Sequence, residues 1–104
     1  MVYHQHFVIH LMKIYIKLIY CLTKEFEVPK PSNYTGDTFV DGTEEGEWRE
    51  DAMGVDNVWK YEWVSMSIKE SGYNNTFGAF STPTLWAKWS DDGKDGAGIE
   101  YVYR

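Results

Sequence analysis

Bulky apolar side chains recur at every second position in the run 13–22. On an extended backbone, one face would carry Ile14, Ile16, Leu18, Tyr20 and Leu22. Lys17 falls on the opposite face. Because successive side chains of a β-strand point to opposite faces, this period predicts a strand over 13–22. The run is apolar at the helical period as well, so a buried helix stays open as the alternative.

Two further runs, 58–69 and 79–89, are predicted to be strands, and the first of them shows the same alternation. In the first, one face carries Val64, Met66 and Ile68, and the other carries Trp59, Tyr61, Trp63, Ser65 and Ser67. Pro83 places the second run at a sheet edge or a bulge, because proline has no N–H to donate. The stretch 71–78 between the runs is rich in Gly and Asn and is typical of a turn. The two runs are therefore predicted to pair as an antiparallel hairpin.

These runs, together with an aromatic share of 17%, predict an all-β fold. A chain of 104 residues is long enough for one domain with a modest core. We expect a small Ig/fibronectin III-like sandwich, complete or incomplete, in which two sheets pack their apolar faces together. The predicted hairpin would form its centre, with the apolar N-terminal strand or helix appended.

Composition divides the chain into three parts. Residues 1–23 form an apolar N-terminal segment that need not belong to the fold, and 24–90 form the β-sandwich-like module. The stretch 91–98 is rich in Gly and Asp and is expected to be a hinge. The alternation returns in 99–103, so 91–104 is predicted to be a hinge and the start of a following strand. The run 16–20 resembles 99–103, which fits a repeat of about domain size.

The charge of the chain is uneven. The formal net charge is −6, and every acidic residue follows the first 23 residues, which contain Lys13 and Lys17. An acidic surface repels phosphate backbones, so we expect no nucleic-acid partner. The two lysines inside the apolar run 8–22 disfavour a membrane span. The single Cys21 excludes an internal disulfide and fits assembly in a reducing compartment.

Candidate metal ligands are sparse along the chain. His4, His6 and His10 are the only histidines, and no cysteine or acid lies near them in sequence. The stretch 91–96 resembles the start of a calcium loop, but positions 3 and 12 of that loop would be Gly93 and Val102 instead of oxygen ligands. We therefore predict no metal site and no cofactor.

The most prominent candidate binding residues are aromatic. They are Trp59, Tyr61, Trp63, Trp86 and Trp89, which could stack on sugar rings if exposed. A small β domain also needs large rings in its core, and we favour that interpretation. The carboxylates of 44–51 lie in a polar stretch typical of a solvated loop, and no nucleophile or phosphate-loop motif is present. We expect no enzymatic activity.

Three stretches carry a resemblance to a known group of proteins. They are KYEWVS at 60–65, FSTPTLW at 80–86 and DGKDGAGIEYVY at 92–103. They resemble repeat modules of tail and tail-fibre structural proteins of phages and prophages, in which fibronectin type III-like modules alternate with collagen-like links. The stretch 22–31 is similar to the lead-in of such a module. The resemblance covers about 18–104 and has no counterpart in 1–17.

The resemblance implies a non-catalytic structural or spacer module. Its partners would be neighbouring modules or other subunits of a virion-like assembly, and it would be assembled in the bacterial cytoplasm into a phage tail. The alternative is a β module that binds a surface glycan or receptor through exposed Trp and Tyr side chains. A small protein anchored in a membrane through the run 8–22 is the least favoured expectation.

Overall fold

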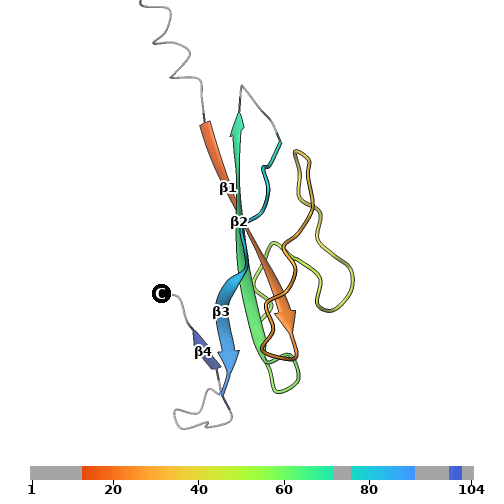
Figure 1. Cartoon of the computed structure of the whole chain (residues 1–104), viewed down its shortest axis with the longest axis vertical. Coiled ribbons are helices and arrows are strands. Elements are labelled where there is room, and N and C mark those ends of the chain that lie inside the picture. The colour runs from red at the N-terminus through yellow and green to blue at the C-terminus, as the bar shows by residue number, and fades with distance from the viewer. Residues whose placement is uncertain (1–12, 72–75, 91–98, 102–104) are drawn as a thin grey trace, which may run out of the picture.

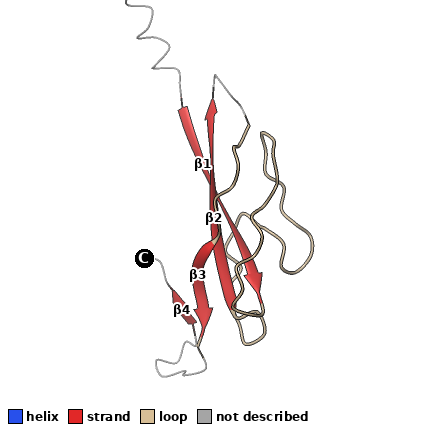
Figure 2. Ribbon diagram, viewed as in Figure 1, coloured by secondary structure: helices blue, strands red, loops and turns tan. Residues whose placement is uncertain are grey.

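The computed structural model describes residues 13–71, 76–90 and 99–101. These residues form one antiparallel sheet in the order β1-β2-β3-β4 (Figure 1). The strands are β1 (Lys13–Thr23), β2 (Tyr61–Ser71), β3 (Thr84–Trp89) and the short β4 (Ile99–Tyr101). Strands and loops account for all the described residues, with no helix among them (Figure 2). The all-β prediction is confirmed for this part of the chain, as a single sheet.

The run that allowed either a strand or a helix is a strand. β1 pairs antiparallel with β2 over its whole length, from Lys13 opposite Ser71 to Thr23 opposite Tyr61. Thirty-seven intervening residues, 24–60, leave the sheet as a long loop before β2 begins. Residues 13–23 are therefore an integral strand of the sheet.

The two faces of the β1–β2 pair differ in what covers them. Ile19 and Cys21 of β1 are 0% and 1% exposed, and Trp63, Ser65 and Ser67 of β2 are also buried. The face that alternation marks as apolar, which begins with Ile14 and Ile16, is instead largely exposed. The loops pack on the face of Ile19, and we call this the covered face.

Aromatic side chains from the loops build the core over the covered face. Ile19 contacts Phe39 and Phe80, and the half-buried Tyr34 and Trp48 pack against this cluster. Phe39 meets Phe80 edge to face, with ring centroids 5.8 Å apart. The ring of Trp48 is fixed by an Nε1–H bond to the carbonyl of Lys30 at 3.2 Å. Large rings delivered by loops thus replace the second sheet that a sandwich would supply.

Two serines on the covered face explain how the segment 76–81 reaches the sheet. Ser67 Oγ donates to the Gly78 carbonyl at 2.7 Å, and Ser65 Oγ donates to the Ser81 carbonyl at 2.5 Å. The Ser81 N–H in turn donates to the Met66 carbonyl at 2.8 Å. Small hydroxyl side chains allow this close approach and supply the carbonyls of Gly78 and Ser81 with donors.

The predicted hairpin is confirmed as an antiparallel β2–β3 pair, but its strands are shorter. Regular pairing runs only over Tyr61–Val64, and a bulge lies between Glu62 and Trp63. The second strand was predicted to start at Ala79 and starts at Thr84, directly after Pro83. The reason is that the segment 76–81 is joined to β2 by isolated hydrogen bonds, several of which involve serine side chains. It does not form the regular backbone ladder of a β-strand.

The last described strand, β4, joins the same sheet. Ile99 lies opposite Trp89 and Tyr101 lies opposite Ala87, so these residues extend the sheet beyond β3. Sequence alone suggested that they begin a following unit. The predicted hinge at 91–98, half of the predicted turn at 71–78 and the three histidines lie outside the described residues. The division at 23/24 coincides with the end of β1.

Candidate interaction surface

One face of the sheet carries a group of large apolar side chains that the loops leave uncovered. We call it the open face, and it comprises Ile14, Ile16, Leu18, Met66 and Ile68. Their exposed fractions are 65%, 63%, 42%, 41% and 46%. Soluble monomers rarely expose apolar patches beyond a few hundred Å² unless the patch has a function. The open face is therefore the candidate interaction surface.

The register of β1 and β2 makes this face continuous. Ile16 lies directly opposite Ile68, and Leu18 lies directly opposite Met66. Side chains opposite one another across antiparallel strands point to the same face with Cβ atoms about 5 Å apart. Ile14 lies opposite Glu70, the charged residue at the upper rim. The result is a ladder of apolar pairs, two strands wide.

A shallow hollow adjoins the lower end of the open face. It has a volume of about 360 Å³, and its lining includes Leu18, Val64, Met66 and Trp86. Tyr20 holds the Trp86 ring edge to face, with centroids 5.5 Å apart at an interplanar angle of 66°. Ser65, Ser81 and Thr84 complete the lining, which is mainly aliphatic and aromatic and suits an apolar side chain.

Below this hollow, the loop that follows Arg49 covers the same side of the sheet. Tyr20 and Arg49 exchange two backbone hydrogen bonds, of 2.7 and 2.8 Å, at the outer edge of β1. The carboxylate of Glu62, which is 0% exposed, accepts the N–H groups of Met53 at 2.6 Å and of Gly54 at 3.3 Å. Burial raises the pKa of Glu62, although the two N–H bonds act in the opposite direction. The open face therefore ends where the Glu62-anchored loop begins.

The acidic residues lie mainly away from the open face. Glu44, Glu45, Glu47, Glu50 and Asp51 are exposed residues of the loop that contributes Trp48 to the core. One of them, Glu50, binds Lys17 Nζ at 2.7 Å, and Lys17 is on the same strand face as Ile19. The acidic stretch is thus a solvated loop surface, as the sequence predicted.

The structure does not bring the five predicted aromatic residues onto one surface. Trp63 is on the covered face, is only 3% exposed, and donates from Nε1 to Thr23 Oγ1 at 2.9 Å. Phe26 stacks on it with centroids 5.7 Å apart. Trp86 is half-buried and borders the hollow at the open face. Trp63 and Trp86 therefore belong to opposite sides of the sheet.

The remaining members of that set are half-buried around the lower end of the sheet. Trp59 lines a hollow of about 450 Å³, and Lys24 Nζ lies 5.0 Å from the centroid of its ring. Tyr61 packs against Phe26, with centroids 5.3 Å apart. The Trp89 N–H donates to the Lys60 carbonyl at 2.8 Å. Of the five predicted aromatic residues, Trp59 has the ring best placed to meet a ligand, and the Lys24 ammonium group lies over one face of that ring.

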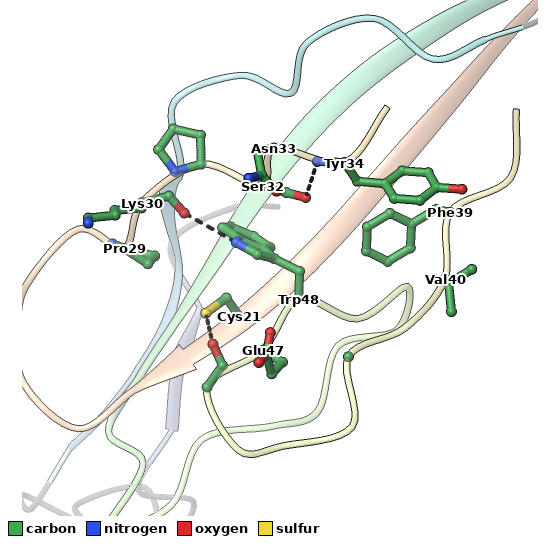
Figure 3. A pocket seen from close by; sticks show the side chains of 13 residues that line it. Cys21, Pro29, Lys30, Ser32, Asn33, Tyr34, Phe39, Val40, Glu47 and Trp48 are labelled. Carbon is green, nitrogen blue, oxygen red and sulfur yellow. Dashed lines mark hydrogen bonds between the residues drawn. The ribbon is translucent and has the colours of Figure 1, made fainter. Parts of the chain in front are cut away.

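A larger hollow of about 590 Å³ lies between the loops and the covered face (Figure 3). Cys21, Tyr34, Phe39 and Trp48 help to line it. The Cys21 thiol donates to the Gly46 carbonyl at 2.9 Å, and burial raises its pKa to about 11, with Glu47 and Glu62 adding to the effect. A thiol this hard to ionise is a poor nucleophile, so Cys21 acts here as a packing residue.

Within the described ranges, no three His, Cys, Asp or Glu side chains gather as a metal site would require. No helix long and apolar enough to cross a membrane occurs in the part of the chain that the structure describes. Comparisons with protein-family models, curated proteins and solved structures gave no significant match.

Sequence reasoning identified the members of the open face but not their role. Alternation on β1 marks Ile14, Ile16 and Leu18, and alternation on β2 marks Met66 and Ile68. The open face could not be identified from alternation because β1 and β2 carry apolar residues on both faces. A sheet with two apolar faces must be covered on both sides, and the loops of this chain cover one side and a part of the other.

Proposed function

We propose that this chain is a non-catalytic structural module and that its open face is where a neighbouring module packs. The supporting observation is the continuous ladder of exposed apolar pairs, Ile16 with Ile68 and Leu18 with Met66. A ligand site for a small molecule would place a few convergent polar groups among its apolar walls. The ladder of the open face is instead apolar and two strands wide, which suits contact with another sheet.

The sandwich expected from the sequence belongs to this proposal. A β-sandwich needs two sheets whose inner faces pack about 10 Å apart. In this chain the loop aromatics occupy the covered face, so a second sheet would pack on the open face. The module would then complete its architecture only in an assembly.

We propose further that the assembly is a phage tail or tail fibre. The stretches 60–65, 80–86 and 92–103 support this identity through their resemblance to phage and prophage tail modules. Antibodies raised against the chain, applied with gold labels to purified particles of a phage that encodes it, test the proposal. Label on the tail or its fibres is the expected result. Particles that carry no label and contain no trace of the chain by mass spectrometry would refute it.

Glycan binding is a second candidate function, and one observation favours it. Trp59 borders a hollow that also includes Glu25 and Glu27, and such acids can bind sugar hydroxyls beside an aromatic ring. Wild type and Trp59→Ala are to be compared on a glycan array. Binding that is lost in Trp59→Ala supports this role, and its absence from the wild type excludes it for the glycans tested.

A further inference from the structure

We propose that the open face packs against the open face of a second copy of this chain, so that two sheets form one sandwich across a two-fold axis. This inference rests on the proposed packing role of the face and names its partner. A two-fold contact uses the same patch on both copies, so the patch must complement itself. Its area, charge and shape each bear on this requirement.

The area is sufficient for a homodimer of moderate affinity. At about 200 Å² for a fully exposed large side chain, the five exposed fractions amount to roughly 500 Å² per copy. Two such faces together would bury about 1,000 Å², which is the lower limit for a specific protein–protein interface. We therefore expect a dissociation constant of about 1–100 µM, since interfaces at this limit are weak.

The charge distribution favours this face for contact between identical acidic chains. The formal net charge of each copy is −6, so most approaches bring like charges together. The five side chains of the open face are uncharged, and the acidic loop 44–51 is joined to the covered face through Trp48. Contact through the open faces keeps these acidic loops on the outside of the sandwich.

Glu70 selects the orientation of the two copies. It lies opposite Ile14 at the upper rim, so strands running in the same direction would bring the two Glu70 carboxylates together across the interface. We place the two-fold axis in the plane between the two sheets, perpendicular to the strands and at the level of the Lys17–Ser67 pair. The two Glu70 residues are then about six residues, or roughly 20 Å, apart along the strands.

The same orientation fits the relief of the face. Ile14 and Ile16 are the most exposed of its side chains, and the hollow lined by Leu18, Val64, Met66 and Trp86 lies at its other end. With the axis at the Lys17–Ser67 level, Ile16 of each copy faces Leu18 of the other, and Ile68 of each faces Met66 of the other. Leu18 and Met66 line the hollow, so Ile16 and Ile68 of one copy pack at the edge of the partner's hollow.

Sedimentation velocity on the full chain, from about 1 µM to about 500 µM, tests the proposal with the variants Ile68→Glu and Met66→Lys. Both positions are on β2, which lies inside the sheet, so neither would take part in a contact made through the outer edge of β1. We expect the wild type to dimerise and each variant to bind itself at least about 30-fold more weakly, because each places an unpaired charge in a dry interface. Val40→Glu is the matched control, since Val40 is 69% exposed on a loop, and it should dimerise as the wild type does.

The decisive sample is an equimolar mixture of Ile68→Glu and Met66→Lys. In the proposed orientation, Glu at position 68 of one copy faces Lys at position 66 of the other, so the mixture should recover at least about 10-fold of the lost affinity. Circular dichroism must show that both variants keep the wild-type spectrum.

A wild type that stays monomeric throughout, a dimer insensitive to both substitutions, or a mixture without recovery would each overturn the proposal. If the chain is monomeric but the antibodies against it label phage tails, the dimer is refuted and the proposed function stands. If the chain dimerises but is absent from phage particles, the dimer stands and the assignment to a phage tail is refuted.

Discussion

The buried carboxylate of Glu62 accepts the backbone N–H of Met53, with 2.6 Å between Oε2 and the nitrogen. A second bond, from the Gly54 N–H, reaches Oε1 at 3.3 Å. One side chain of β2 thereby fixes the loop that closes the lower end of the open face. No cation is among the causes that shift the pKa of Glu62, and burial is the largest of them. The stability of this corner of the molecule should therefore depend on pH.

We predict that Glu62 makes the protein less stable as the pH rises above the unfolded pKa of a glutamate, about 4.3. Burial raises the folded pKa of Glu62, so the folded state holds the proton more tightly than the unfolded state does. Its favourable contribution is complete below the unfolded pKa and is lost as the pH rises through the folded pKa. Urea unfolding of wild type and Glu62→Gln at a series of pH values from 4 to 8 measures this.

The difference between the two proteins isolates Glu62 from the other carboxylates. Glu62→Gln keeps an acceptor oxygen and should gain stability relative to wild type as the pH rises. Glu62→Ala leaves the N–H groups of Met53 and Gly54 without their acceptor and should cost about 1–3 kcal/mol at pH 4, with a smaller cost as the pH rises. A wild-type minus Gln difference that does not change with pH would contradict the assignment.

Cys21 is predicted to resist thiol reagents while the protein is folded. Cys21 is 1% exposed, and its thiol donates to the Gly46 carbonyl and has a pKa raised to about 11. At pH 8 roughly one thiol in a thousand would be ionised, and the thiolate is the reactive form. A disulfide reagent should label the native chain at least about 100-fold more slowly than glutathione. Labelling at the glutathione rate in native buffer would contradict the burial of this thiol, whereas labelling at that rate in urea is expected because the chain is unfolded there.

The serines of β2 should be more important for stability than their polarity suggests. Ser67→Ala removes the donor to the Gly78 carbonyl and should cost about 1 kcal/mol. Ser67→Val should cost more, because a branched side chain would push the segment 76–81 away from the sheet. Thr43→Ala, at an exposed loop position, is the control and should change stability by less than about 0.5 kcal/mol. Thermal unfolding followed by circular dichroism would rank the three, and equal effects at positions 43 and 67 would contradict the packing described.

The sequence predicted the strands better than it predicted what covers them. Alternation located β1 and most of β2 because period two is a local property of these runs. It could not show that Ile19 and Cys21, and not Ile14 and Ile16, are buried, because both faces of β1 carry apolar residues. That choice depends on Phe39 and Phe80, which come from loops with no periodicity.

The start of β3 and the candidate surface were missed for related reasons. The side-chain bonds of Ser65 and Ser67 take the place of a regular ladder along 76–81, and propensity does not register such bonds. The aromatic platform assumed that Trp63 and Trp86 share a face. The bulge next to Trp63 and the burial of its ring are tertiary features.

Substitutions at two glycines should destabilise the protein for different reasons, backbone strain at Gly54 and lack of space at Gly42. Gly54 has φ of +90° and nothing within 4 Å of an added Cβ, so Gly54→Ala should cost about 1 kcal/mol through strain alone. Asn tolerates this left-handed region better, so Gly54→Asn should recover a part of the loss. A Cβ on Gly42 would overlap the Cβ of Glu47, and Gly42→Ala should also destabilise. Chemical denaturation of the variants measures each cost, and Gly54→Asn less stable than Gly54→Ala would contradict the strain argument.

Ile19 and Ile16 provide a direct comparison of the two faces of β1. Ile19 is 0% exposed beneath Phe39 and Phe80, whereas Ile16 is 63% exposed. Ile19→Ala should cost about 2–5 kcal/mol, because it removes buried methyl groups and leaves a cavity that the rings can fill only in part. Ile16→Ala at about 1 µM protein, the lower end of the expected dissociation constants, should cost less than about 1 kcal/mol.

Raising the protein concentration should change one of these two costs. If open faces associate, the cost of Ile16→Ala should increase between about 1 µM and about 500 µM, because dimer formation stabilises the folded wild type and less so the variant. The cost of Ile19→Ala should stay constant, because Ile19 is enclosed within one copy. Urea unfolding by tryptophan fluorescence at both concentrations measures this. A larger cost at position 16 than at position 19 in dilute protein would mean that the two faces of β1 have been assigned the wrong way round.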